Sequence, residues 1–287
     1  MLNFTIDQSK CNRCGLCVVD CPRNIIQLDT RAIASSATVF PATFYPYIPA
    51  DKEELCFDCQ HCMAICPHAA LSIGGRSVEQ SLPIPGHLPD PAALETLIKG
   101  RRSVRQFAKE DLAQDLIEHL LEVASHAPTG VNVQQVHFHV IKERATMDTF
   151  RHQCIEALRE VIKEGKLPEK RNYFAEFVRQ WDEKGLDILF RGAPHLVVTS
   201  APAKMPTPQT DALIALATFE LYAMASGVGT LWDGFALYTI RDIAPELRAT
   251  LGIPEDHVIG YVMAFGKPAV KYQRTVQRAK AKIAYVD

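Results

Sequence analysis

Beyond residue 90, apolar and polar positions fall into blocks long enough for regular helices and strands. A helical period of 3.6 residues predicts helices over 91–99, 111–127 and 205–227. Alternating or continuous apolar runs predict strands over 136–141, 195–200 and 258–266. Asp90 is suited to cap the first helix, because Pro91 follows it at the first helical position. This mixture of helices and strands predicts an α+β fold.

The first 80 residues show a different pattern, with only short apolar stretches. Ile25–Leu28 and Ala69–Ile73 each follow a cysteine-rich run and are predicted to be short strands. Residues 31–52 hold three prolines and several aromatics, which predicts an irregular insertion. Residues 74–91 are rich in Gly, Pro and Ser, as is typical of a linker. We therefore predict a first domain over 1–80, a linker over 81–90 and a second domain over 91–287.

The predicted helix over 205–227 is apolar nearly all round. A helix of this kind is buried on every side rather than along one stripe. Burial at an interface between two copies of the chain and burial in an ordinary core both explain the pattern.

Composition and charge place the chain among ordinary globular proteins. Of its 287 residues, 47% are hydrophobic and 22% are charged, and the formal net charge is -2. This balance predicts neither nucleic acid nor an anionic membrane as a partner. Residues 1–10 lack the apolar core of a secretion signal, and no apolar run reaches the roughly 18 residues of a membrane span. The expected location is the cytoplasm.

The cysteines carry the strongest chemical signal in the sequence. Eight of the nine lie in two runs with the same spacing, C-x2-C-x2-C-x3-C-P. This spacing wraps three corners of a [4Fe–4S] cube, and the fourth cysteine binds the other cube. One cluster is predicted to take Cys11, Cys14, Cys17 and Cys66. The other is predicted to take Cys56, Cys59, Cys62 and Cys21.

Zinc sites or a disulfide framework would also use paired cysteines. Two identical runs of four cysteines, closed by Pro22 and Pro67, favour iron–sulfur clusters instead. Gly15 leaves room for backbone N–H groups to approach cluster sulfur. Cys154 stands alone in the sequence and is expected to be a small buried hydrophobic residue.

Residues 1 to about 80 resemble a bacterial two-cluster ferredoxin. The spacer from Cys21 to Cys56 is longer than in compact ferredoxins. The loop over 32–49 is therefore expected to have an additional role, such as packing on the second domain.

Four loop motifs stand out in the second domain. Residues 100–107 read G-R-R-S-V-R-Q-F, and arginine forks of this kind bind phosphate oxygens, although such a run taken alone is more often a solvated charged turn. Residues 127–134 read A-P-T-G-V-N-V-Q and form a polar turn. Residues 229–235 read G-T-L-W-D-G-F. The fourth motif is Gly266-Lys267-Pro268, followed by two arginines.

The order of these motifs resembles the nitroreductase family of FMN flavoproteins, over about residues 91–287. The resemblance assigns the FMN phosphate and ring edge to Arg101, Arg102, Ser103 and Arg105. It assigns contact with the isoalloxazine across a dimer interface to Pro128, Thr129, Gly130 and Asn132. The segment under the flavin would be Leu231, Trp232, Asp233 and Gly234, with the Gly234 N–H near flavin N5. Late phosphate ligands would be Arg278 and Arg274.

Two positions depart from the family pattern. Gln135-Val136 follow Gln134 where many relatives have Pro-Trp, so the substrate face of the flavin is expected to differ. Lys267 stands where the late motif commonly has Tyr, and this change is expected to affect only the loop.

The resemblance implies a homodimeric iron–sulfur flavoprotein oxidoreductase. It would pass electrons from the two [4Fe–4S] clusters to FMN and on to a small acceptor such as a nitroaromatic or quinone. The donor would be ferredoxin or NAD(P)H, and the latter would stack directly on the flavin because no G-x-G-x-x-G follows a strand. No general acid or base stands out, and His126, His137 and His139 are expected to have surface or core roles.

Two other readings remain open. The protein could be an electron-transfer module between ferredoxin and a partner, with no small substrate of its own. It could also dehalogenate or oxidise a substrate under an added lid. Residues 151–184, charged and rich in aromatics, are either this lid or a solvated helix pair.

Overall fold

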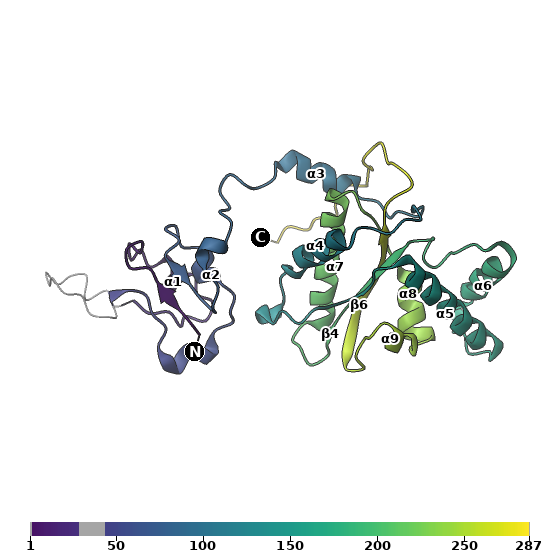
Figure 1. Ribbon diagram of the computed structural model, residues 1–287, viewed down its shortest axis with the longest axis horizontal. Helices are drawn as coiled ribbons and strands as arrows, with labels where there is room; N and C mark the ends of the chain where they lie inside the picture. The colour runs from purple at the N-terminus through teal and green to yellow at the C-terminus, as the bar shows by residue number, and fades with distance from the viewer. Residues whose placement is uncertain (1, 29–43, 287) are drawn as a thin grey trace. The chain divides into compact units, whose positions relative to one another are not determined.

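The computed structural model describes residues 2–28 and 44–286 (Figure 1). The chain divides into two compact units, Met1–Leu88 and Pro89–Asp287. Residues 81–90 are all exposed and contain no helix or strand. Most of the predicted insertion lies outside the described residues, which resume at Phe44. No helix in the described part is long and apolar enough to cross a membrane.

The first unit is built from short elements around a small core. Strand β1 (Thr5–Ile6) pairs antiparallel with β2 (Leu71–Ser72). The helical elements are α1 (Leu16–Val19), α2 (His61–Ala64) and the 3-10 turns η3 (Ala50–Leu55) and η4 (Val78–Gln80). Ile25, Ile26, Leu71 and Ile73 are buried between the two cysteine runs. The predicted short strand over Ala69–Ile73 therefore contains a real strand.

The predicted strand over Ile25–Leu28 is wrong. Only Gln27 forms a ladder contact there, an isolated bridge to Tyr47, and the strand that pairs with β2 lies at the N-terminus instead. The apolar run at Ile25 and Ile26 reflects burial of both side chains, 2% and 4% exposed, and not strand geometry.

The internal repeat of the sequence is also a repeat of backbone conformation. Cys11 and Cys56 begin the two runs, an offset of 45 residues (56 minus 11), and the same offset relates α1 to α2. It also relates three pairs of residues with positive φ: Arg13 and Asp58 (61° and 50°), Gly15 and Gln60 (77° and 58°), and Asn24 and Ala69 (52° and 46°). Left-handed residues at matching places therefore give the two cysteine runs the same local turns.

The second unit contains a four-stranded antiparallel sheet in the order β3-β4-β6-β5. Its strands are β3 (His137–Ile141), β4 (His195–Pro202), β5 (Gly229–Trp232) and β6 (His257–Gly266). Its α-helices are α3 (Pro91–Gly100), α4 (Gln114–Ser125), α5 (Arg144–Lys163), α6 (Tyr173–Lys184), α7 (Pro208–Ala225), α8 (Gly234–Tyr238) and α9 (Leu247–Thr250). Shorter turns are η5 (Gly130–Asn132), η6 (Glu169–Arg171) and the π-helical η7 (Thr239–Ile243).

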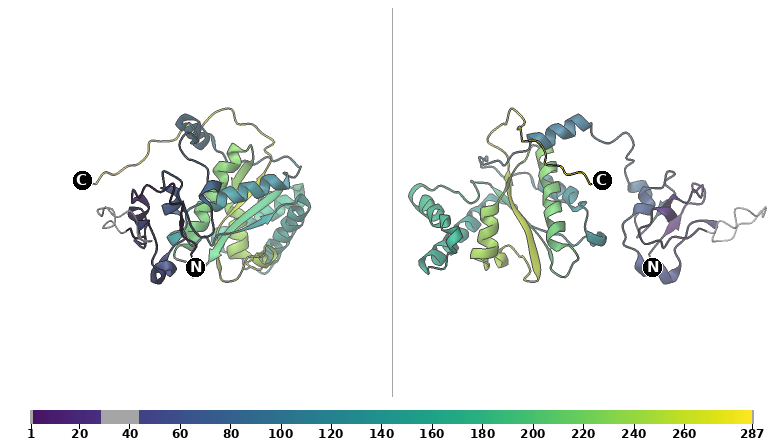
Figure 2. Two further views of the ribbon diagram at one scale, coloured as in Figure 1. Left: turned by 60° about the vertical axis from the view of Figure 1, so that its left-hand side comes forward. Right: turned by 180° about the vertical axis from the view of Figure 1, so that it is seen from behind.

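Helices cover both faces of this sheet (Figures 1 and 2). On the central strand β4, Val197 packs with α4 and α7, whereas Leu196 and Val198 pack with α5, α6 and α8. Alternate residues of a strand face opposite sides, so this fully buried strand serves two cores. All three predicted strands and all three predicted helices of this unit are present, and Asp90 accepts a hydrogen bond from the Ala93 N–H at the start of α3.

Helices α5 and α6 span most of the segment considered as a lid or a solvated helix pair, and each buries one face in the core and leaves the other exposed. Cys154 is fully buried in α5, as predicted, and Phe174 is fully buried in α6. The Arg151 side chain reaches Asp187 at 2.7 Å and the Ala193 carbonyl at 2.8 Å. This pair ties α5 to the segment that leads into β4.

Candidate functional site

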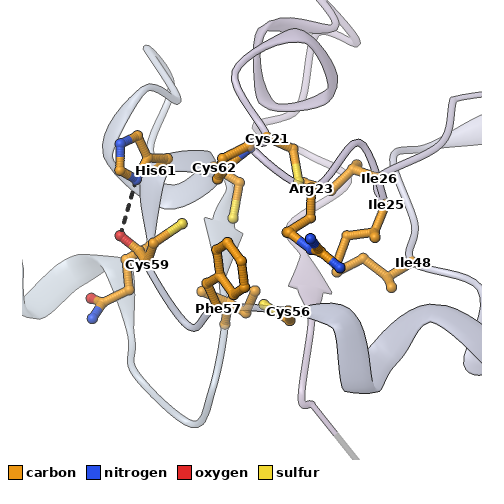
Figure 3. Close-up of a pocket in the computed structure, with 13 residues that line it drawn as sticks. Cys21, Arg23, Ile25, Ile26, Ile48, Cys56, Phe57, Cys59, His61 and Cys62 are labelled. Carbon is orange, nitrogen blue, oxygen red and sulfur yellow. Dashed lines mark hydrogen bonds between the residues drawn. The ribbon is translucent and has the colours of Figure 1, made fainter. Parts of the chain in front are cut away.

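Two cavities in the first unit each collect four cysteines. One is lined by Cys11, Cys14, Cys17 and Cys66. The other is lined by Cys21, Cys56, Cys59 and Cys62, and Figure 3 shows these four around it. The structure therefore brings together the two crossed sets that the spacing predicts, with one cysteine of each run placed beside the other run.

The surroundings of the thiols suit a buried cluster. Burial raises the pKa of Cys62 to about 12 and that of Cys17 to about 11, and neighbouring cysteines add to the shift. Such thiols become thiolates only when iron supplies compensating charge. Backbone N–H groups already point at sulfur, from Asp58 to Cys56 Sγ at 3.4 Å and from Ala70 to Cys66 Sγ at 3.3 Å. The donor set thus fits iron–sulfur clusters.

The cysteine sets are not arranged for single ions. In residues 2–28 and 44–286, no three Cys, His, Asp or Glu side chains converge where one metal ion could bind.

The end of the predicted insertion that the structure describes packs beside the cysteine cavities. Phe44 is buried under the Arg13 guanidinium, 4.1 Å from the ring centroid. Pro46 lines the Cys11 cavity, and Ile48 lines the Cys56 cavity. On the other side, Arg23 covers the Phe57 ring at 4.8 Å. This part of the insertion therefore helps to enclose both cysteine sets.

In the second unit, the arginine-rich segment is held between β5 and the C-terminal segment. The Val104 N–H donates to the Thr230 carbonyl at 2.8 Å, and the Ala108 N–H donates to the Lys267 carbonyl at 2.8 Å. Val104 fills the space above Gly229, where an added Cβ would lie 2.8 Å from its side chain. Three of the four loop motifs therefore meet in one place, although they are distant in the sequence.

An open cavity of about 650 Å³ lies at this meeting point. That volume is in the range of small-molecule sites. Its cationic lining comprises Arg101, Arg102, Lys271 and Arg274, and its other lining includes Leu97, Met224, Gly229, Thr230 and Tyr272. An adjoining cavity shares Arg101 and adds Lys99 and Arg278. The cluster of cations over a partly apolar floor suits a phosphorylated heterocycle such as FMN.

The predicted arginines differ in whether they line this cavity and in what they bind. The Arg101 guanidinium donates to the Glu220 carboxylate of α7 at 2.8 Å, and the Glu220 side chain is only 5% exposed. Arg105 is exposed, and its guanidinium donates to the Ser103 carbonyl at 3.3 Å instead of lining the cavity. Ser103 forms a backbone bridge to Thr230.

The polar turn over 127–134 lies elsewhere on the same subunit. Gly130 donates its N–H to the Asp211 carboxylate at 3.1 Å, near the start of α7. Glu220 follows Asp211 by nine positions, so the two carboxylates are about 14 Å apart along the helix. Pro128, Thr129, Gly130 and Asn132 therefore do not meet the arginine cavity within one chain.

The segment Leu231–Gly234 turns from β5 into α8. Asp233 caps that helix by accepting from the Ala236 N–H at 2.9 Å, while its second oxygen is buried without a hydrogen bond. Burial raises the pKa of Asp233 to about 8, so its carboxyl is largely protonated at neutral pH. Gly234 lies against Tyr261, since an added Cβ would be 3.2 Å from the phenol oxygen. The residues of this segment lie at the end of β5 and the start of α8, and they are not among those that line the arginine cavity.

Two acids escaped the sequence analysis, Asp211 and Glu220. Both lie on a helix read as apolar nearly all round, and both are 4% exposed. A buried carboxylate needs a partner. Acidic residues in an otherwise apolar helix therefore indicate that hydrogen-bond or charge partners from a distant part of the sequence contact them.

Comparison with known proteins gives the same division of the chain. Residues 98–267 match the model of the nitroreductase family, and residues 10–80 match the 4Fe-4S dicluster domain. A nitroreductase of Mycolicibacterium smegmatis, NfnB, is 31% identical over 193 residues, which are 56% of this chain and 77% of NfnB. A protein of Methanothermobacter thermautotrophicus, provisionally named NADH dehydrogenase/NAD(P)H nitroreductase, is 26% identical over 199 residues, which are 68% of this chain and 86% of that protein.

A solved structure shares the fold. A nitroreductase with bound FMN from Bacteroides fragilis superposes with a TM-score of 0.53 at 23% identity, covering 67% of this chain and 98% of its own.

Proposed function

The chain belongs to the nitroreductase family of FMN-dependent oxidoreductases and carries a 4Fe-4S dicluster domain, and we propose that it is an iron–sulfur flavoprotein. It would pass electrons from two [4Fe–4S] clusters to FMN and on to a small acceptor such as a nitroaromatic or a quinone. The observation that carries the proposal is the presence in one chain of two four-thiol cavities and a cation-lined cavity.

Each cysteine set would hold one cluster. Cys11, Cys14, Cys17 and Cys66 would bind the first cluster, and Cys21, Cys56, Cys59 and Cys62 the second. The N–H groups of Asp58 and Ala70, which already face ligand sulfur, would stabilise the more negative reduced state. The apolar lining of Ile25 and Ile26 would keep water from the second cluster.

The cation-lined cavity would bind the FMN phosphate. Arg102, Arg274 and Arg278 supply fork-shaped donors, and Arg101 is oriented by its pair with Glu220. FMN supplies chemistry that protein side chains lack, because it can accept one or two electrons. The chain's own residues bind and orient it, and the Gly234 N–H is proposed to lie near N5.

A second copy of the chain would complete each flavin site. The turn over 128–132 lies about 14 Å along α7 from the arginine cavity, so the two parts would come from different subunits. Apolar side chains at the edge of the unit support such an interface. Leu94 and Ile98 of α3 are 41% and 53% exposed, and Tyr285 near the C-terminus is 86% exposed. We propose a homodimer with two FMN sites.

The test uses full-length protein purified without oxygen and soaked with FMN. It should show iron–sulfur and flavin absorbance, and it should reduce a nitroaromatic when dithionite or reduced ferredoxin is supplied. Arg102→Ala serves as a matched variant and should lose flavin while keeping its iron. Protein that retains its clusters but binds no flavin after soaking would contradict the proposal. Bound flavin without turnover of any nitroaromatic or quinone would reduce the role to electron transfer between proteins.

A further inference from the structure

We infer that Asp211 is a positioning residue, which holds the turn over 129–134 in the conformation that meets the flavin. The inference deepens the proposed function and rests on the FMN site described there. Asp211 is a buried acid of α7 that lies outside both the cysteine runs and the arginine-rich segment.

The turn has an unfavourable backbone. Val131, Asn132 and Gln134 have φ values of 46°, 57° and 50°, all in the left-handed region. That region is uncommon for residues with a side chain, and for a β-branched residue such as valine it is an outlier. Val131 is also 52% exposed, so its own packing does not hold it there. Strained backbone of this kind persists where surrounding contacts impose it, and it is enriched at ligand sites.

Asp211 supplies the imposing contacts from α7. Its Oδ1 accepts the Gly130 N–H at 3.1 Å and the Thr207 hydroxyl at 2.8 Å, and its Oδ2 accepts the same Gly130 N–H at 3.2 Å. The residue is 4% exposed, so these bonds are shielded from water. It lies in the first turn of α7, where the helix dipole favours a negative charge.

A second contact closes the turn from inside. The Thr129 hydroxyl accepts the Gln134 N–H at 3.0 Å. Gly130 fits tightly beneath, since an added Cβ would lie 2.3 Å from the Thr207 hydroxyl oxygen that Asp211 holds in place. Asp211 and Thr207 therefore support the turn at Gly130, directly before the strained residues Val131, Asn132 and Gln134.

The chemistry of the contacts provides a matched pair of variants. With its amide oxygen at the Oδ1 position, Asp211→Asn can keep the bonds from Gly130 and Thr207, but it places an NH2 group where Oδ2 accepts the Gly130 N–H. Asp211→Ala loses all of these bonds. Asp111→Ala is the stability control, because the Asp111 carboxylate also accepts one backbone N–H, from Arg144 at 2.8 Å, but at the start of α5.

The experiment measures FMN affinity and the visible circular dichroism of bound flavin in the full-length holoprotein, with amide exchange at Gly130 as a readout of the turn. Asp211→Ala should weaken FMN binding about tenfold, the effect of losing roughly 1.4 kcal/mol of hydrogen bonding, and should change the dichroism. Asp211→Asn should weaken FMN binding less than Asp211→Ala does, because it can keep the two Oδ1 bonds. Exchange at Gly130 should speed up most in the alanine variant.

Two results would overturn the inference while leaving the FMN proposal intact. The first is an Asp211→Ala protein that melts earlier, as Asp111→Ala does, yet binds FMN with the parent affinity and dichroism. The second is an Asp211→Ala protein in which the Gly130 amide exchanges as slowly as in the parent. If the parent protein itself binds no FMN, the proposed function fails, and Gly130 exchange still shows whether Asp211 holds the turn.

Discussion

Arg101 and Glu220 form an ion pair at 2.8 Å between the arginine-rich segment and the interior of α7. The Glu220 side chain is 5% exposed and that of Arg101 is 25% exposed, so the carboxylate depends on this partner far more than the guanidinium does. Thr230 of β5 also points its hydroxyl at the same carboxylate, at 3.5 Å. One buried acid thus fixes one edge of the proposed phosphate site.

Removal of Arg101 should therefore damage stability as well as binding. Arg101→Ala leaves Glu220 buried without its charge partner, a change that costs about 3 kcal/mol in comparable buried pairs. Arg101→Ala combined with Glu220→Leu should recover most of that free energy of unfolding, because no unpaired charge remains. FMN affinity should stay low in both variants. Chemical denaturation and flavin titration measure the two effects separately.

Arg102 is the control for this pair, since it lines the same cavity. Arg102→Ala should weaken FMN binding with little loss of stability. Equal destabilisation by the two alanine variants would show that the Arg101–Glu220 pair has no special structural role.

Crossed ligation predicts a specific pattern of cluster loss. Cys66→Ala should disturb the cluster bound by Cys11, Cys14 and Cys17, although Cys66 belongs to the other run in sequence. About half of the iron should be lost, and FMN should remain bound. Iron analysis and electron paramagnetic resonance of the reduced protein measure this. Loss of FMN with both clusters intact would contradict the assignment, as would loss of the cluster bound by Cys56.

Asp233 should make the protein less stable as pH rises. Burial raises its pKa from 3.8 in the unfolded chain to about 8 in the folded protein. Asp233 makes its full contribution to the free energy of unfolding below about pH 4, where its carboxyl is protonated in both the folded and the unfolded protein. Above that pH, the contribution declines by about 1.4 kcal/mol per pH unit until the folded pKa is reached. Asp233→Asn should remove this decline, so thermal midpoints of the variant and parent should diverge most near pH 8. Parallel profiles would show that the carboxyl is not protonated in the fold.

A histidine pair should have the opposite effect at acid pH. The Ser200 hydroxyl lies between His139 Nε2 at 2.8 Å and His257 Nδ1 at 2.9 Å, and a hydroxyl can donate to one neutral imidazole while it accepts from the other. Burial lowers the pKa of His139 and His257, and His137 adds repulsion to both. The other charged neighbours are Arg248 and Asp256, which act on His257 in opposite directions.

The folded-state pKa values of His139 and His257 lie below the unfolded value of 6.5. The two neutral histidines therefore make their full contribution to the free energy of unfolding above pH 6.5, and this contribution is lost as the pH falls through the lowered folded values. His139→Asn should flatten the decline in thermal midpoint as the pH falls below about 6.5. An unchanged slope would assign the acid sensitivity to other groups, of which the buried His195 is the first to examine, since burial also lowers its pKa.

Local patterns in the sequence predicted the parts of the fold that depend on local chemistry. The two cysteine runs, the cap at Asp90 and the main strands each follow from residues close together in the chain. Crossed pairing of Cys21 and Cys66 could also be predicted, because the repeat and the spacing together determine it. The strand at Thr5–Ile6 could not, because two residues are too few to show a period.

The carboxylates of α7 mark the limit of such reasoning. Asp211 binds a turn 81 residues away in sequence, and Glu220 binds an arginine 119 residues away. Nothing near either residue indicates its partner, and only tertiary packing brings them together. Their positions decide where the flavin motifs lie, so the relative placement of those motifs needed the three-dimensional structure.

The central claim is that the clusters deliver electrons to the flavin. The direct measurement is anaerobic stopped-flow, in which fully loaded protein is mixed with reduced ferredoxin and the flavin absorbance is followed. A Cys56→Ala variant, which should lack one cluster and keep FMN, is run beside the parent, with NADH and NADPH as alternative donors. We predict rapid flavin reduction by ferredoxin in the parent and reduction at least about tenfold slower in the variant. Equal rates in the two proteins would contradict the claim, because they would show that electrons reach FMN without the clusters.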